Sequence, residues 1–157
     1  IFSQALFAMR RPDDIPAVPK YIQEWESPFG PEATRFPLQI IAHHTLHRVH
    51  STHDNNDWLE EAFPQRLFLN PLDAAARGIA DGDEVRVWND RGATVVKCRV
   101  TARIMPGVVD LPSGAWWKPD ETGTDRGGSI NVLTSDRWTP LAFGTAQQTT
   151  MAQVEKA

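Results

Sequence analysis

All five histidines of the 157-residue chain fall in one short segment: His43, His44, His47, His50 and His53. Neutral imidazoles are common zinc ligands, so a metal site is one interpretation of this cluster. A structural zinc site usually takes four ligands, often cysteines, from separate parts of a fold. Here the candidates share one segment, and the single cysteine, Cys98, lies elsewhere in the chain. We therefore favour two other interpretations over zinc: a solvated polar loop, or a loop that binds a ligand.

The same segment carries donors suited to an anionic ligand that contains flat rings. A pyrophosphate favours cationic and hydroxyl donors, and a heterocycle presents ring edges that need paired donors and acceptors. A guanidinium can form a charge-assisted fork with phosphate, and imidazoles and hydroxyls add further donors. These groups belong to His44, Thr45, Arg48, His50, Ser51 and Thr52. Of the interpretations of this segment, we favour ligand recognition.

Two further segments could contact such a ligand. Gly127 and Gly128 precede Asn131, and glycines allow a close backbone approach while an amide side chain offers a donor and an acceptor. An ordinary glycine-rich turn explains that segment equally well. Trp116 and Trp117 could stack on a ring, although we favour their packing beneath a loop.

Composition and charge exclude several classes of function. The formal net charge of −4 disfavours nucleic-acid binding, which needs a basic face. No apolar run approaches the roughly 20 residues of a membrane helix, so we expect no direct membrane insertion. The acidic residues at 81–84 and 54–61 are interpreted as solvated surface charge. A small hydrolase with a histidine-centred site remains an alternative, but no Ser, Cys or carboxylate stands in a nucleophile motif.

Short strands and turns must position these residues. An apolar strand is predicted at 38–42, a helix at 57–63 that Pro64 stops, and a strand at 66–69. Asn70 is expected to cap a helix at 71–77 that Gly78 ends. A hairpin at 85–88 and 93–101 and a strand at 108–111 follow. This mainly β pattern with short helices predicts a closed or nearly closed β-barrel at 37–157.

Residues 1–36 are expected to form a proline-rich connector that lies over a neighbouring surface. Prolines lack an amide donor and restrain the preceding residue, so regular structure should not propagate through 11–37. Tyr21, Trp25 and Phe29 would then need a covering surface. The chain opens on Ile1 and Phe2 with no signal sequence in view, which suggests a piece of a longer protein.

Four motifs occur in an order that resembles a known family. They are HRVHST at 47–52, NPLDAAARGIADGDEVRVWNDRG at 70–92, VTARIMPGVVDLPSGAWW at 100–117 and GGSINVLTS at 127–135. The helix, the Gly-Ile turn and the Gly-Asp step into a strand resemble a double-psi β-barrel. The full set resembles the C-terminal molybdopterin-dinucleotide-binding domain of the dimethyl sulfoxide reductase family. Within it, the chain is most similar to catalytic A subunits of anaerobic dimethyl sulfoxide reductases and their selenate-reducing relatives.

The resemblance implies a function and a set of contacts. It implies a molybdenum ion held by two molybdopterin guanine dinucleotides, with the metal ligand and an iron–sulfur cluster outside this chain. By resemblance, the cofactor contacts fall on His44, Thr45, Arg48, His50, Ser51, Asn131 and Gln148. Around Gln148, relatives often carry His and Asn, so the chain departs from the family there.

The resemblance also implies partners and a location. The implied partners are the rest of a catalytic subunit, an iron–sulfur electron-transfer subunit and a membrane anchor. The implied location is the periplasmic side of a bacterial inner membrane. The isolated chain is then not expected to be catalytic. The alternative is a free-standing double-psi barrel that acts as a binding or assembly module. The donor-rich 47–52 loop and Asn131 favour the first interpretation, because an adaptor has no need of them.

Overall fold

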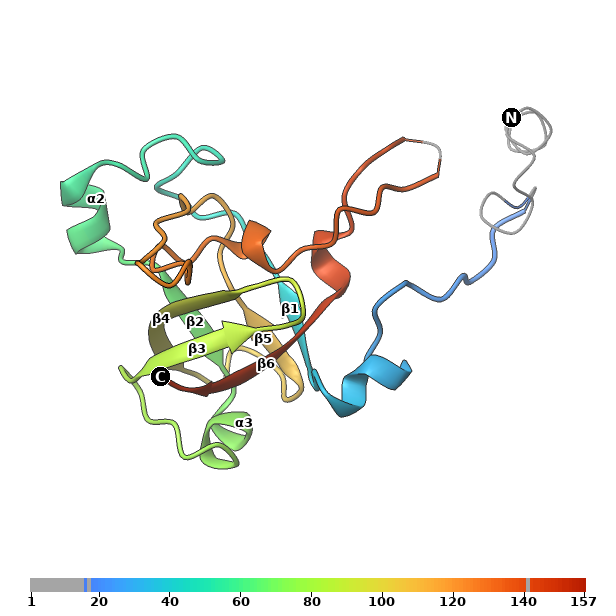
Figure 1. The fold of residues 1–157 in the computed structure, drawn as a ribbon, viewed down its shortest axis with the longest axis horizontal. Coiled ribbons are helices and arrows are strands. Elements are labelled where there is room, and N and C mark those ends of the chain that lie inside the picture. The colour runs from blue at the N-terminus through green and yellow to red at the C-terminus, as the bar shows by residue number, and fades with distance from the viewer. Residues whose placement is uncertain (1–15, 17, 141) are drawn as a thin grey trace.

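Six short strands close into one barrel in the order β1-β5-β2-β4-β3-β6 (Figure 1). The structure, a computed structural model, describes residues 16, 18–140 and 142–157. The strands are β1 (Leu38–Ile41), β2 (Arg66–Leu69), β3 (Glu84–Trp88), β4 (Ala93–Val100), β5 (Val108–Asp110) and β6 (Thr150–Lys156). The helices are short: α2 (Asp57–Ala62), α3 (Pro71–Ala75), and the 3-10 turns η1 (Pro31–Thr34), η2 (Ile130–Val132) and η3 (Gln147–Thr149).

The barrel combines parallel and antiparallel pairs. Strand β1 is parallel to β5, and β2 is parallel to β4. The remaining neighbours, β1/β6, β2/β5, β3/β4 and β3/β6, are antiparallel. Two parallel pairs within one closed, mixed barrel are the double-psi arrangement, so the predicted fold class is confirmed. Closure pairs every strand on both sides and leaves no exposed edge.

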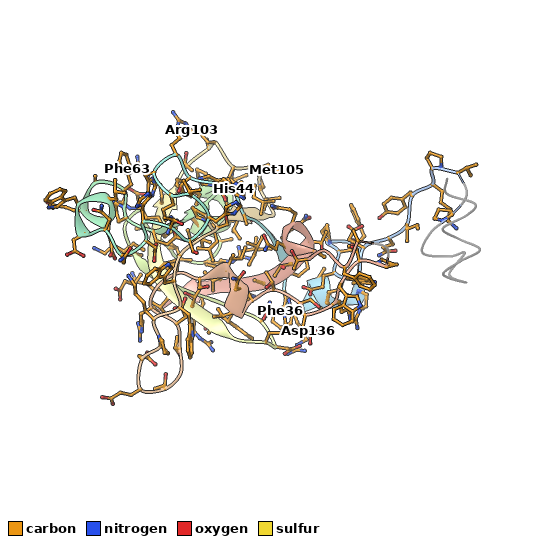
Figure 2. The ribbon with its side chains drawn as sticks, turned by 90° about the horizontal axis from the view of Figure 1, so that it is seen from above. Phe36, His44, Phe63, Arg103, Met105 and Asp136 are labelled. Carbon is orange, nitrogen blue, oxygen red and sulfur yellow. The ribbon has the colours of Figure 1, made fainter. Side chains whose placement is uncertain are left out.

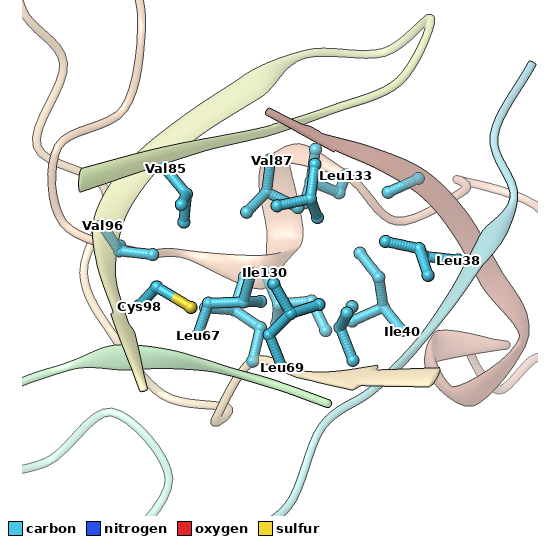
Figure 3. Close-up of a cluster of buried hydrophobic side chains, with 14 of the residues drawn as sticks. Leu38, Ile40, Leu67, Leu69, Val85, Val87, Val96, Cys98, Ile130 and Leu133 are labelled. Atoms are coloured by element: carbon cyan, nitrogen blue, oxygen red, sulfur yellow. The ribbon is translucent and has the colours of Figure 1, made fainter. Parts of the chain in front are cut away.

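Alternate side chains of each strand fill the interior (Figure 3). Val85 and Val87 from β3 face Leu67 and Leu69 from β2, and all four are fully buried. Ile130 and Leu133, from the segment around η2, enter the same cluster. Each such side chain contributes about 1.5–3 kcal/mol by leaving water. The segment that carries Asn131 is therefore anchored in the core.

The predicted turns around α3 are confirmed. The Asn70 side chain accepts a hydrogen bond from the Leu72 amide at 2.9 Å and donates to the Ile104 carbonyl at 2.7 Å. Gly78 has a φ of 64°, the left-handed conformation that ends a helix at low cost for glycine. The helix itself ends at Ala75, earlier than the predicted 77.

Strand β6 was not predicted from the sequence. Its residues Ala152, Gln153 and Glu155 have weak strand propensity, so local pattern gave little signal. The strand forms because it closes the barrel between β1 and β3, burying Met151, Ala152 and Val154 almost completely. Tertiary pairing outweighs local preference here.

The described part of the proline-rich lead-in is held to the barrel near its end. Phe36 is buried and packs edge-to-face on Trp88 with ring centroids 5.6 Å apart. Arg35 pairs with Asp90 at 2.7 Å, and Glu26 pairs with Arg91 at 2.7 Å. The turn η1 is a regular element that the proline pattern did not predict. The boundary at residue 36 remains a prediction, and residues 1–15 and 17 lie outside the described residues.

Farther from the barrel, the lead-in aromatics are exposed. The exposed fraction is 75% for Tyr21 and 88% for Phe29. This agrees with the expectation that they need a covering surface. None of the helices in the described residues has the length and apolar character of a membrane span.

Candidate cofactor-binding site

The candidate residues meet at one end of the barrel. Because β1 and β5 are parallel, their C-terminal ends open at the same end, and the loops that follow them lie together. The Ser113 amide donates to the His43 carbonyl at 3.0 Å across these two loops. Figure 1 shows α2 with its preceding loop at this end and α3 at the opposite end. The loops 42–56, 111–131 and 147–149 form the site.

A cavity of about 490 Å³ lies between two of the predicted segments. Its lining includes Ser51 from the histidine loop and Asn131 from the glycine-rich segment. Both residues are exposed, and the carboxamide of Asn131 forms no hydrogen bond with any residue that the structure describes. The other lining residues are Ala115, Trp116, Trp117, Ser129 and Val132. The fold therefore brings together two candidates that are distant in the sequence.

The two tryptophans of the cavity are exposed, at 45% for Trp116 and 61% for Trp117. The interpretation that they pack beneath a loop is therefore wrong. Their indole rings line the cavity and present apolar faces on which a flat ring could stack.

The histidine loop and the tryptophan loop are tied together. The Trp116 amide donates to the Asp54 carboxylate at 2.8 Å, and the Trp116 indole N–H donates to the Ser51 carbonyl at 2.7 Å. Gly114 has a φ of 97°, and a Cβ there would collide with the His50 carbonyl oxygen. Only glycine permits this approach. The Trp116 backbone and Ser51 therefore hold a fixed relative position.

Arg48 makes its contacts inside the chain. It is 8% exposed, and its two terminal nitrogens donate to Asp54 and, at 2.6 Å, to Gln65. The Gln65 amide in turn donates to the carbonyls of Pro112 and Gly128 at 2.8 and 3.0 Å. The Arg48 guanidinium, which we expected to be available for phosphate, is therefore already hydrogen-bonded within the chain. Asp54, predicted as solvated charge, is instead a nearly buried partner of Arg48.

The glycine pair at 127–128 serves loop packing. A Cβ at Gly127 would collide with the Trp116 carbonyl oxygen, and a Cβ at Gly128, where φ is 78°, would meet the Gln65 and Val96 side chains. The close backbone approach predicted for this pair is made to neighbouring loops of the same chain. It brings the Asn131 segment against the tryptophan loop.

His44, His50 and Thr45 lie at the same end. The rings of His44 and His50 are 5.2 Å apart, and both residues are exposed. The Thr45 hydroxyl oxygen is buried and has no hydrogen-bond partner among the described residues. A buried hydroxyl without a partner is costly, so it indicates a position where a ligand or water could bind.

Gln148 has a structural contact. Its side-chain oxygen accepts from the Ala42 amide at 2.9 Å and its side-chain nitrogen donates to the Ala42 carbonyl at 3.2 Å. This pairing continues the β1/β6 ladder with a side chain. The amide predicted to contact the cofactor is thus already paired with the backbone.

His43 and His47 contact other residues of the chain. His43 Nδ1 lies 2.6 Å from the Asp110 carboxylate, and the His47 ring stacks on Phe63 with centroids 4.9 Å apart. Partial burial lowers the pKa of His47, which favours its neutral form. In the described part of the chain, no three His, Cys, Asp or Glu side chains are grouped to hold a metal ion.

Sequence reasoning missed Asp125, a fully buried carboxylate. It accepts hydrogen bonds from the amides of Lys118, Gly127 and Ser129 and from the Thr94 hydroxyl. An Asp two residues before a glycine is typical of side-chain-capped turns, which is the signal that could have found it.

A second cavity, of about 360 Å³, lies between the lead-in and the 135–137 segment. Figure 2 shows two of its lining residues, Phe36 and Asp136, near each other and away from His44 and Phe63. None of the predicted cofactor contacts lines this cavity.

Comparison with known proteins places the chain in a family. A model of the Molydopterin dinucleotide binding domain matches residues 38–151. The chain is 46% identical to dimethyl sulfoxide reductase DmsA of Escherichia coli (strain K12), over 99% of this chain and 20% of that protein. It is 43% identical to the dimethyl sulfoxide/trimethylamine N-oxide reductase of Rhodobacter capsulatus, over 92% of this chain and 18% of that protein.

A solved structure is similar in fold. Acetylene hydratase from Pelobacter acetylenicus matches with a TM-score of 0.75 and 17% identity, over 89% of this chain and 21% of that one. The chain spans about a fifth of the length of the curated relatives that it matches. The family model covers the barrel except residues 152–156 of β6, and it includes every residue that lines the cavity. The chain belongs to the molybdopterin-dinucleotide-binding domain family and resembles the C-terminal region of dimethyl sulfoxide reductases.

Proposed function

We propose that this chain is the cofactor-binding C-terminal domain of a molybdenum oxidoreductase that reduces dimethyl sulfoxide or a related oxide in anaerobic respiration. The observation that carries the proposal is the cavity that joins Ser51 and Asn131 beside two exposed tryptophans. It lies within a domain whose family binds molybdopterin dinucleotides. The relatives named as dimethyl sulfoxide reductases support the substrate class.

The donor set of the cavity fits a pterin dinucleotide. The carboxamide of Asn131 and the hydroxyl of Ser51 offer donors and acceptors to ring edges, and the tryptophan faces suit flat rings. His44, His50 and the unpartnered Thr45 hydroxyl provide further donors at the same end of the barrel. The bound cofactor supplies oxygen-atom transfer at molybdenum. The residues of this chain hold and orient it and line the walls around it.

The complete protein is proposed to extend well beyond this chain. We propose that the cofactor is a molybdenum bis(molybdopterin guanine dinucleotide), with its metal ligand and an iron–sulfur cluster in the rest of the catalytic subunit. An iron–sulfur electron-transfer subunit and a membrane anchor would complete the complex at the periplasmic side of the inner membrane. On this proposal the isolated chain has no oxide reductase activity.

Exposed apolar side chains favour a domain of a larger subunit over a free-standing module. Leu46, Val49 and Trp58 are 106%, 65% and 83% exposed near the candidate site. The lead-in aromatics are exposed as well. Clusters of exposed apolar residues mark surfaces that pack against a partner. On our proposal, these surfaces pack against the other domains of the catalytic subunit.

The test compares Asn131→Ala with Asn55→Ala in the complete subunit. Asn55 is an exposed amide of the 42–56 loop, one of the loops that form the site, and it does not line the cavity. Loss of the Asn131 amide leaves polar groups of the ligand unpaired, at about 1–3 kcal/mol per group, so occupancy should fall roughly tenfold or more. The measurement is molybdenum and guanine nucleotide per purified subunit, together with the thermal midpoint.

We expect Asn131→Ala to lose cofactor with a nearly unchanged midpoint, and Asn55→Ala to resemble the wild type. If Asn131→Ala keeps wild-type molybdenum while its midpoint collapses, Asn131 is a structural turn residue and the site assignment is wrong.

A further inference from the structure

Two walls of the cavity are formed by the segments 115–118 and 127–132, and Asp125 accepts hydrogen bonds from both. One of its carboxylate oxygens accepts from the Lys118 amide at 2.8 Å and the Gly127 amide at 3.0 Å. The other oxygen accepts from the Ser129 amide at 2.7 Å and the Thr94 hydroxyl at 2.7 Å. The residue is fully buried. Among the residues that the structure describes, the donors to this carboxylate are backbone amides and one hydroxyl, and none is a basic side chain.

We infer that Asp125 is a positioning residue that fixes the two walls of the cavity relative to each other and to the barrel. Lys118 directly follows Trp116 and Trp117 on one wall, whereas Gly127 and Ser129 lead to Asn131 on the other. This inference rests on the proposed cofactor role of the cavity. It assigns to Asp125 no contact with the cofactor itself.

Backbone hydrogen bonds to β4 anchor Asp125 to the barrel. The Asp125 amide donates to the Ala93 carbonyl at 3.1 Å, and its carbonyl accepts from the Val95 amide at 2.8 Å. These bonds add a short parallel bridge to the start of the strand. They also explain why the consecutive residues Thr94 and Val95 are both buried, although successive side chains of a strand point to opposite faces. Asp125 thereby fixes the loop that carries both walls to the start of β4.

Asp125→Asn tests the carboxylate without changing its size. An amide nitrogen cannot accept a hydrogen bond, so either pair of donors loses its acceptor. Each of the two oxygens serves at least one wall donor, and therefore the substitution loosens a wall in either orientation of the amide.

Asp120→Asn is the matched control. Asp120 belongs to the same loop and also accepts several donors: the Thr122 amide and hydroxyl, the Thr124 amide and the Arg126 guanidinium. None of these donors is an amide of Lys118, Gly127 or Ser129, which are the wall donors to Asp125. The control therefore applies the same chemical change to the same loop and leaves the hydrogen bonds between Asp125 and the walls in place.

Amide exchange of the 157-residue chain gives the first readout. We expect Asp125→Asn to speed exchange roughly tenfold or more at Lys118, Gly127 or Ser129, with the amides of β3 and β6 unchanged. Asp120→Asn should leave those three amides as in the wild type. Equal acceleration throughout the barrel would make Asp125 a general stabilising residue and overturn the inference, as would no acceleration at all.

Cofactor content of the complete subunit gives the second readout. Asp125→Asn should lower molybdenum and guanine nucleotide per subunit roughly tenfold, and Asp120→Asn should not. If the wild-type subunit holds no such cofactor, the proposed function fails, while the exchange data still decide whether Asp125 fixes the walls. If the wild type is loaded and Asp125→Asn stays fully loaded despite local opening, the positioning role is wrong.

Discussion

At the scale of single residues, Arg48 is a nearly buried cation whose partners are Asp54 and Gln65. Removing one member of such a network leaves the others unpaired away from water. We predict that Arg48→Ala lowers the unfolding free energy of the chain by about 3 kcal/mol. Urea unfolding measures it, with Arg103→Ala as the control because Arg103 is exposed. An Arg48→Ala chain as stable as the control would show that the contacts of Arg48 with Asp54 and Gln65 do not stabilise the fold.

Cys98 is a second residue whose environment sets its chemistry. Burial, together with nearby Asp81 and Asp83, raises the pKa of its thiol to about 11. The folded-state pKa lies above that of an unfolded thiol. The associated stability is therefore complete below about pH 9 and is lost as pH rises through about 11.

The prediction for Cys98 concerns alkaline unfolding. Cys98→Ala cannot ionise, so the stability difference between wild type and variant should shrink when urea unfolding is measured at about pH 10.5 instead of about pH 8. A difference that stays constant over this range would show that the thiol is not held in its neutral form by the fold.

The candidate residues also show what the sequence can predict about a site. Ser51 and Asn131 line one cavity as an exposed hydroxyl and an exposed amide, in agreement with their types. Arg48 and Gln148 were selected for the same chemistry, yet each is paired within the chain. Residue type indicates what a side chain can donate or accept. Whether that side chain is already hydrogen-bonded to another residue depends on how loops that are distant in the sequence pack against each other.

At the scale of elements, β6 is the strand that closes the barrel. It pairs with β1 along residues 150–152 and with β3 along residues 153–156. Without it, β1 and β3 become open edges and the interior faces water. We predict that a chain ending at Thr149 shows no cooperative unfolding transition by circular dichroism, whereas a chain ending at Lys156 unfolds as the wild type does. Cooperative unfolding of the shorter chain would mean that β6 is dispensable.

The elements that the sequence predicted well are those with local signals. Asn70 and Gly78 mark the two ends of α3 by capping and by positive φ, and β2 has the predicted bounds. Strand β6 and the Asp125 bridge were missed, because both depend on pairing with distant segments. Local propensity decides turns and caps, whereas barrel closure is a property of the whole chain.

At the scale of the whole molecule, the barrel presents one end to the proposed cofactor and much apolar surface around it. The lead-in, the 42–56 loop and the 138–143 segment all carry exposed large apolar side chains, among them Phe29, Leu46 and Trp138. The chain spans about a fifth of its relatives, so the surfaces that would cover these side chains belong, on our proposal, to the remainder of the subunit. On the same proposal, the double-psi barrel is the frame, and the loops at one end of it supply the contacts with the cofactor.

The most direct test of the proposed function is a structure of the complete subunit loaded with its cofactor. We predict that a dinucleotide ring lies between the Trp116–Trp117 wall and Asn131, with the Asn131 amide or the Ser51 hydroxyl at about 3 Å from polar atoms of the ligand. A dinucleotide that meets the barrel at the opposite end, beside α3, or that makes no contact with this chain, would contradict it.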